Sequence, residues 1–123
     1  MIRKKYCVDG AWLESKTEKW IPVTDSSTGA VIAEVPSCTQ NEVLAAIDAA
    51  DRAFPAWSQM SLSKRTQLLF HWRNVLMEHL EELTLLCARE LGKTLNEARG
   101  DVLKAIEPTE LACATPYLTQ GAA

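Results

Sequence analysis

The stretch that decides the fold joins two long apolar patterns and reads Glu90-Leu91-Gly92-Lys93-Thr94-Leu95-Asn96-Glu97-Ala98-Arg99-Gly100-Asp101-Val102. Its Gly92-Lys93-Thr94 looks like the end of a phosphate-binding loop, but that loop needs a first glycine five positions earlier, where Cys87 stands. It also needs a strand upstream, and the upstream residues follow a helical period instead. The sequence therefore predicts that Gly92 ends one helix in a left-handed conformation and that Thr94, together with Glu97, caps the next.

Helical periodicity extends upstream of this junction. A wide apolar stripe runs over residues 68–91, and Ser61 or Ser63 is a suitable cap for the helix that carries it. Because the run is long, we expect a break near His79. Trp72 lies on the stripe, which predicts that its ring belongs to the core.

A proline interrupts the helix expected after the junction. Apolar residues recur at helical spacing over 95–113. Pro108 lies inside this segment, where it removes the hydrogen bond to the Lys104 carbonyl at a cost of about 3 kcal/mol in an unrelieved helix interior. We therefore predict that the helix kinks or restarts near Glu107 and that Pro116 and Gly121 end the regular structure.

Another amphipathic helix is predicted before the apolar stripe. Thr39 and Glu42 form a capping box at its start. Pro55 is expected to end the regular helix or to lie just past its end. The apolar face of this helix consists of Val43, Ala46, Ile47, Ala50, Ala53, Phe54 and Trp57. Because Trp57 lies on this face, its ring is predicted to belong to the core.

The first third of the chain is typical of extended structure. The pair Asp9-Gly10 separates two short apolar runs at 6–8 and 11–13, which is the strongest short-range signal for a hairpin. Two further extended runs follow at 20–23 and 30–35, and turn residues lie between them. Period-two patterning therefore dominates up to Pro36, where the helical period takes over.

These patterns together predict an α+β fold. Short strands and turns occupy residues 6–36, and three to four amphipathic helices follow over 39–118. A chain of 123 residues is the usual length of one small domain, so we expect a single domain over 1–123.

The composition narrows the possible partners. Lys and Arg number 13 against 16 Asp and Glu, a net charge of −3, which gives no general electrostatic drive toward nucleic acid or an anionic membrane. No apolar run approaches the length of a membrane span, and no secretory signal pattern is present, so the expected location is cytoplasmic. The four scattered cysteines form no C-x-x-C pair and are expected to be reduced and mostly buried: Cys7, Cys38, Cys87 and Cys113.

Residue types that carry catalysis lack the spacing that they need. Cys113 lies toward the negative end of its predicted helix, which favours a buried structural thiol over a nucleophile. His71 and His79 are eight residues apart on one helix, too far to chelate a metal, and are expected to be partly exposed. No two glycines are two residues apart, so the dinucleotide-binding fingerprint is absent. We predict no catalytic and no cofactor-binding residue in this chain.

The order of the motifs resembles the N-terminal part of the aldehyde dehydrogenase superfamily from about Tyr6 to Gly121. The family's hairpin, turn-strand and helix motifs correspond to Val8-Asp9-Gly10-Ala11-Trp12, Ser27-Thr28-Gly29-Ala30-Val31-Ile32-Ala33-Glu34-Val35-Pro36, Ala46 to Trp57, Arg89-Glu90-Leu91-Gly92-Lys93-Thr94 and Glu97-Ala98-Arg99-Gly100-Asp101-Val102. Each motif is weak singly, and their common order makes the resemblance strong. It implies that the strands and helices form part of the scaffold of the cofactor-binding domain.

A narrower resemblance points to the CoA-acylating methylmalonate-semialdehyde dehydrogenases. It is carried by Gly100-Asp101-Val102, by Ile106-Glu107 and by the run Glu110-Leu111-Ala112-Cys113-Ala114-Thr115-Pro116-Tyr117-Leu118. In the full-length enzymes the resemblance implies thiolate attack on an aldehyde, hydride transfer to NAD and release of the acyl group to CoA. The family's nucleophilic cysteine, general-base glutamate and cofactor loop lie outside the matched segment. The resemblance therefore implies that this chain alone is inactive and needs no cofactor.

The resemblance also implies one metal site. Many family members hold a structural monovalent cation with backbone carbonyls of the strand before the turn and with an acidic side chain before the Gly-Lys pair. The matching positions are Val23, Thr24 and Glu90. Hard oxygen ligands of this kind suit such an ion.

Three interpretations of the whole chain follow. The first is a truncated aldehyde dehydrogenase that is inactive alone. The second is a helical interaction module whose bare apolar faces form a homo-oligomer or bind a full-length relative. The third is a fragment cut from a longer gene, which the coding sequence downstream of Ala123 would decide.

Overall fold

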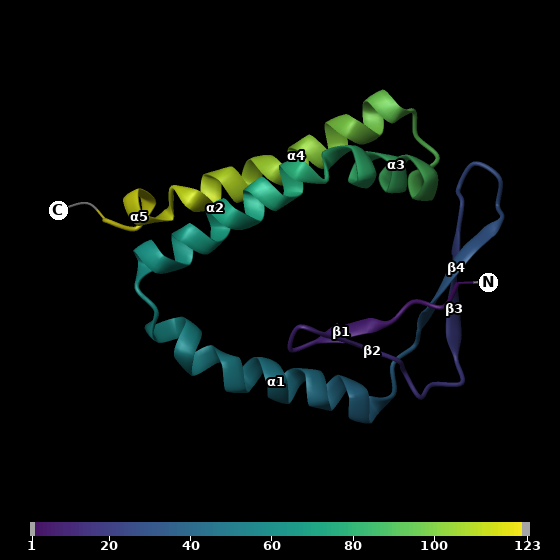
Figure 1. Cartoon of the computed structure of the whole chain (residues 1–123), viewed down its shortest axis with the longest axis horizontal. Helices are drawn as coiled ribbons and strands as arrows, with labels where there is room; N and C mark the ends of the chain where they lie inside the picture. The colour runs from purple at the N-terminus through teal and green to yellow at the C-terminus, as the bar shows by residue number, and fades with distance from the viewer. Residues whose placement is uncertain (1, 122–123) are drawn as a thin grey trace. The chain divides into compact units, whose positions relative to one another are not determined.

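The computed structural model describes residues 2–121 and divides the chain into two compact units. The first unit, residues 1–58, holds the strands β1 to β4 and helix α1 except for its last residue, and the second, residues 59–123, holds helices α2 to α5 (Figure 1). The boundary falls inside the predicted helical part and not at the change from strands to helices. The prediction of a single domain stays a prediction.

The first hairpin forms where the Asp9-Gly10 pair predicted it. Strands β1 (Tyr6–Val8) and β2 (Ala11–Leu13) pair in antiparallel register, with Cys7 opposite Trp12. Asp9 and Gly10 have φ values of 52° and 74°. Both central residues of a tight type I′ turn need a positive φ, which aspartate tolerates and glycine adopts without cost.

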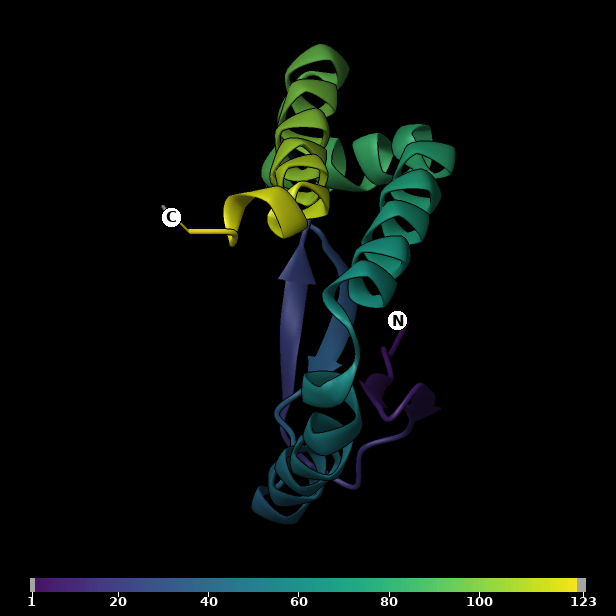
Figure 2. The same ribbon diagram turned by 90° about the vertical axis from the view of Figure 1, so that its left-hand side faces the viewer.

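The second hairpin is longer and joins β3 (Trp20–Thr24) to β4 (Val31–Pro36), as Figure 2 shows. The pairing register shifts between Val23 and Thr24, which is a β-bulge or a similar irregularity. Asp25 closes the turn, because its Oδ1 accepts the backbone N–H of Ser27 at 2.9 Å and that of Thr28 at 3.1 Å.

Helix α1 spans Gln40–Gln59 and begins with the predicted capping box. The Thr39 N–H donates to Glu42 Oε2 at 2.7 Å, and the Glu42 N–H donates to Thr39 Oγ1 at 3.4 Å. The prediction that Pro55 ends the regular helix is wrong, since the helix continues for one further turn. Proline removes only its own hydrogen bond, and the residues after it still donate theirs.

In the second unit, α2 (Leu62–Glu78) and α3 (Leu80–Leu91) are separated at His79, where the break was predicted. Ser61 caps α2, since its Oγ accepts the N–H of Lys64 at 3.4 Å. Helix α4 (Leu95–Cys113) then lies along both α2 and α3, in agreement with Figure 1.

Of the kink or restart predicted near Glu107, the restart is wrong and the kink stays a prediction. Helix α4 runs through Pro108 without interruption, and the short helix α5 (Thr115–Leu118) follows it with Pro116 in its first turn. Pro108 is exposed, so water can solvate the Lys104 carbonyl that loses its partner. Beside it, Thr109 Oγ1 donates to the carbonyl of Ala105 at 3.5 Å.

The α+β fold class is confirmed, with short strands followed by a series of helices. The buried apolar core of the described residues is thin and is made by Ala33, Leu80, Ala98, Ile106 and Cys113. Within the same range, no helix combines the length and the apolar character that crossing a membrane requires.

Candidate functional site

The junction at Gly92 is a helix end followed by a helix start, as predicted. Gly92 has a φ of 67°, and its N–H donates to the Ala88 carbonyl. Thr94 Oγ1 accepts the N–H of Glu97 at 3.3 Å, and the Glu97 carboxylate accepts the N–H of Thr94 at 3.2 Å. The hydrogen bond from the Thr94 hydroxyl lowers the pKa of Glu97, so the box closes around a charged carboxylate.

Lys93 is held by a neighbouring acid. Its ammonium group pairs with Asp101 on α4, and this hydrogen bond raises the pKa of Lys93. The lysine of a phosphate-binding loop must instead present its ammonium group to the phosphates. The Lys93–Asp101 pair therefore fastens the start of α4 to the junction, and its geometry is that of a structural contact.

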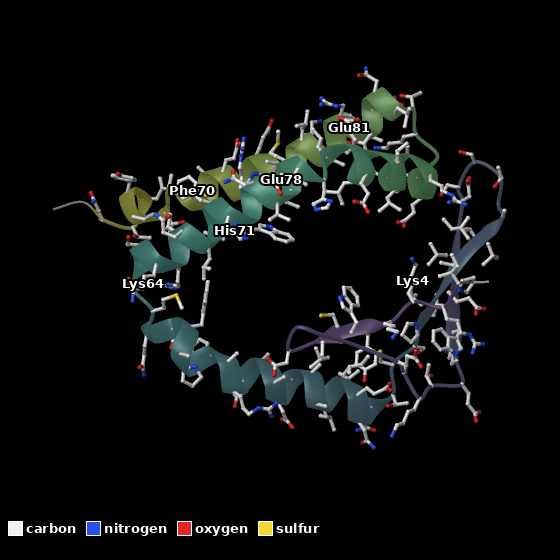
Figure 3. All side chains as sticks on the ribbon, viewed as in Figure 1. Lys4, Lys64, Phe70, His71, Glu78 and Glu81 are labelled. Carbon is white, nitrogen blue, oxygen red and sulfur yellow. The ribbon has the colours of Figure 1, made fainter. Side chains whose placement is uncertain are left out.

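The candidate nucleophile and the histidines have the environments that the sequence predicts. Cys113 is only 6% exposed at the end of α4. His71 on α2 is exposed (Figure 3), and His79 is exposed with its Nδ1 2.9 Å from Glu82 Oε2. No group of three or more His, Cys, Asp or Glu that could hold a metal ion occurs within residues 2–121.

The expectation that the cysteines are mostly buried is wrong. Cys7 is exposed and Cys38 and Cys87 are half-buried, so only Cys113 of the four is buried. The reason is the thin core, which leaves strand β1 and helix α3 partly open to solvent.

The expected cation ligands are divided between the two units. Val23 and Thr24 lie at the register shift in β3, where the backbone leaves the regular pairing, and Glu90 lies on α3. The backbone carbonyls of Val23 and Thr24 and the carboxylate of Glu90 are hard oxygen ligands, which suit a monovalent cation. Whether they meet at one ion stays a prediction.

A polar cluster around Glu42 was only half predicted. Besides closing the capping box, the Glu42 carboxylate accepts the Ser15 hydroxyl and the Lys16 N–H, both at 2.8 Å. The N–H groups of Lys16 and Thr39 are the main cause that lowers the pKa of Glu42 to about 2. The capping-box spacing identified Thr39, but no local signal in the sequence connects Glu42 with a loop 26 residues away.

The second unit contains an apolar cavity of about 370 Å³ between α2, α3 and α4. Apart from Asp101, its walls are hydrocarbon and one thiol, so it offers packing space and few groups that could orient a polar ligand. The lining residues are Leu76, Leu83, Cys87, Asp101, Val102, Ala105 and Ile106.

The predicted core positions of two tryptophans are wrong. Trp57 on α1 is 42% exposed and Trp72 on α2 is 53% exposed. Both lie on the apolar faces that the helical period predicted, and those faces are only partly covered within the described residues, so a large share of each ring stays exposed.

Comparison with known proteins identifies the sequence family of this arrangement. Residues 12–122 match the aldehyde dehydrogenase family. The chain is 42% identical over 121 residues to the malonate-semialdehyde dehydrogenase of Listeria monocytogenes serotype 4a, covering 98% of this chain and 25% of that protein. It is 39% identical over 117 residues to the acylating, mitochondrial methylmalonate-semialdehyde/malonate-semialdehyde dehydrogenase of Rattus norvegicus, covering 95% and 22% of the two chains.

A solved structure shares the fold. It is that of a Sinorhizobium meliloti protein assigned as a methylmalonate-semialdehyde dehydrogenase and complexed with NAD. The TM-score is 0.92 at 24% sequence identity, and the match covers 99% of this chain and 25% of that one. The present chain thus spans about a quarter of the length of the relatives that it matches.

Proposed function

We propose, since the chain belongs to the aldehyde dehydrogenase family, that it is the N-terminal segment of an enzyme similar to methylmalonate-semialdehyde dehydrogenase. The complete enzyme would oxidise an aldehyde to an acyl-CoA with NAD and CoA. One observation carries the proposal: 98% of the chain matches a malonate-semialdehyde dehydrogenase, yet it covers only 25% of that protein. The NAD bound by the Sinorhizobium meliloti protein supports the choice of cofactor.

The segment's own contribution would be structural. Two of its polar clusters, the Thr94–Glu97 capping box and the hydrogen bonds around Glu42, fix helix starts and a loop. Cys113 is buried and serves packing. On this proposal the chain supplies a scaffold and the nucleophile, general base and cofactor loop belong to the rest of the enzyme.

The proposal predicts that the purified chain does not reduce NAD. Incubation with malonate semialdehyde, CoA and NAD should give no rise in NADH absorbance above the rate without protein, because on this proposal the nucleophile and the cofactor loop belong to the rest of the enzyme. The full-length Listeria monocytogenes relative is the positive control under the same conditions. NADH formation that scales with the amount of the 123-residue chain would refute the proposal.

We also propose the monovalent cation site of Val23, Thr24 and Glu90. If the site forms, thermal unfolding should occur at a higher temperature in sodium or potassium than in a large organic cation at equal ionic strength. Glu90→Gln should remove this difference, whereas Glu78→Gln on α2 should preserve it. Identical unfolding temperatures of the unchanged chain in all three cations would contradict the site.

A second candidate function is that of a helical interaction module. Exposed apolar side chains favour it, since Leu68 is 49% exposed and Trp72, one turn away on α2, is 53% exposed. On this proposal the chain associates with itself or with a full-length relative and has no need of nucleic acid or a membrane. For its location we propose the cytoplasm, and cell fractionation would distinguish it from the mitochondrial location of the rat relative.

A further inference from the structure

Residues 2–4 lie on the edge of β4 that faces away from β3. Within the described residues, β3 is the one named strand that pairs with β4, and a parallel bridge joins Arg3 to Glu34 on the other edge. The Lys4 N–H donates to the Glu34 carbonyl at 2.8 Å, and the Glu34 N–H donates to the Ile2 carbonyl at 2.9 Å. Residues 2–4 thus add a short third strand to the sheet.

The opposite edge of the sheet carries a proline. Pro22 of β3 is the register partner of Glu34. Because the Glu34 backbone bonds away from β3, its partner across the antiparallel ladder also turns its backbone groups outward. A proline has no N–H to offer there, and proline on an edge strand is one way in which proteins prevent further pairing. The β3 edge is therefore blocked by its own sequence, whereas the β4 edge is covered by residues 2–4.

The β4 edge has the composition of a strand that pairs readily. Residues 30–35 read Ala-Val-Ile-Ala-Glu-Val, with three β-branched residues, a single charge and no proline. A six-residue segment of high β-propensity and low charge tends to add to another strand when its edge is open. The covering segment is basic, with Arg3, Lys4 and Lys5 in succession, and charged side chains at a sheet edge oppose such addition.

Arg3 fastens the covering segment through its side chain. Its Nε donates to Glu34 Oε2 at 3.3 Å, and its guanidinium carbon lies 4.5 Å from the centre of the Trp20 ring on β3. One guanidinium therefore contacts both strands of the hairpin. The Arg3 side chain is 63% exposed, and exposed ion pairs contribute little to stability. With two backbone hydrogen bonds beside this contact, the segment is held weakly enough to open locally.

We propose that the outer edge of β4 is a pairing surface for the β4 edge of a second copy of the chain, and that residues 2–4 cover it as a releasable strand that Arg3 locks. A second copy is the occupant because it brings the same strand with the same uncovered backbone groups. Antiparallel pairing about a two-fold axis then satisfies both edges at once. The inference goes beyond the proposed function and does not depend on it, since it concerns contacts within the first unit alone.

The test follows amide hydrogen exchange of the 123-residue chain by nuclear magnetic resonance, residue by residue, because mass alone would also report association through the helices. Arg3→Glu puts a carboxylate beside Glu34 and removes the cation from Trp20, so residues 2–4 should be released. The Lys4 amide should then exchange at least tenfold faster than in the unchanged chain. The Glu34 amide should exchange faster in dilute protein and should regain protection as the concentration rises and β4 pairs with a second copy.

Lys4→Glu is the matched control. It makes the same change of net charge one residue away, on the other face of the strand, and keeps the backbone N–H that bonds to Glu34. The Glu34 amide should exchange in this variant as in the unchanged chain. Arg3→Glu combined with Glu34→Arg re-forms the ion pair with its signs exchanged and should restore the protection of the Lys4 amide. Circular dichroism shows whether each variant folds, and Arg3→Gln replaces Arg3→Glu if that variant does not.

Two kinds of result would overturn the inference. Protection of the Lys4 amide that Arg3→Glu leaves unchanged, or a Glu34 amide that exchanges equally fast in Lys4→Glu, would show that Arg3 does not lock the strand. A Glu34 amide that stays fast in Arg3→Glu at every concentration would show that the open β4 edge does not pair with a second copy. Both results would leave the proposed function intact.

Discussion

Glu42 shows how one side chain can join two distant parts of the first unit. Its carboxylate receives hydrogen bonds from Ser15, Lys16 and Thr39, and so ties the loop after β2 to the start of α1. Charge-assisted hydrogen bonds of this kind favour the ionised carboxylate over the protonated acid. The pKa of Glu42 consequently falls from the usual 4.5 to about 2.

The lowered pKa of Glu42 predicts a pH dependence of stability. A carboxylate whose pKa is lower in the folded state stabilises the fold fully above its unfolded pKa, and loses this contribution as the pH falls through the folded value. Glu42→Gln should therefore unfold at lower urea concentration than the unchanged chain at pH 6. The difference should shrink between about pH 4.5 and 2, where Glu42 takes up its proton.

Urea unfolding followed by circular dichroism at a series of pH values measures this effect. Glu18→Gln is the control, because Glu18 is exposed and lies in the same loop region. A difference between the unchanged chain and Glu42→Gln that stays constant from pH 6 to pH 2 would show that the Glu42 charge is not linked to folding.

At the scale of the elements, the junction between α3 and α4 depends on the backbone conformation of one glycine. Gly92 adopts a φ of 67°, where a side chain is strained, whereas Gly100 lies inside α4 with nothing within 4 Å of the position of an added Cβ. The two glycines therefore have opposite relations to their helices. One ends a helix and the other weakens a helix interior.

Alanine substitution at the two glycines should change stability in opposite directions. Gly92→Ala should destabilise the second unit by about 1 kcal/mol, because alanine disfavours the left-handed conformation. Gly100→Ala should stabilise it by about 0.5–1 kcal/mol, the usual difference in helix propensity. Denaturant unfolding of the two variants side by side measures both changes, and a gain in stability from Gly92→Ala would contradict the account of the junction.

The two internal prolines show the limit of local patterns at this scale. Pro55 was expected to end its helix or to lie just past the end, and Pro108 to cause a kink or a restart. Both α1 and α4 continue past their prolines without a break. Local rules give the free-energy cost of the hydrogen bond that a proline removes. Whether the helix continues depends on the stabilisation that the residues after the proline contribute when they are helical. Beyond Pro108 that stabilisation includes Cys113, which is buried at the end of α4, so ending the helix early would have lost more.

At the scale of the whole molecule, exposed apolar side chains dominate the expected behaviour in solution. We expect the isolated chain to bind a hydrophobic dye and to show a light-scattering mass that rises above 13.6 kDa with concentration. Trp72→Gln should lower both signals, since Trp72 is among the most exposed rings of the second unit. A monomer at every concentration that binds no dye would rule out association through the apolar faces.

The sequence by itself determined the local features. The Asp9-Gly10 turn, the caps at Thr39 and Thr94, the break at His79 and the end at Gly92 all lie where the pattern predicted them. In each case the hydrogen-bonding groups that must be satisfied are only a few residues apart. A short segment of sequence therefore contains both the backbone groups that lack a hydrogen-bond partner and the residues that satisfy them.

Only the tertiary structure decided which apolar faces are buried and which polar groups meet across the chain. The period of 3.6 residues placed Trp57 and Trp72 on apolar faces, but whether such a face is covered depends on elements far away in sequence. The same holds for the contact of Glu42 with Ser15 and Lys16. Burial is a property of the surrounding protein, and a periodic pattern specifies the face without specifying its partner.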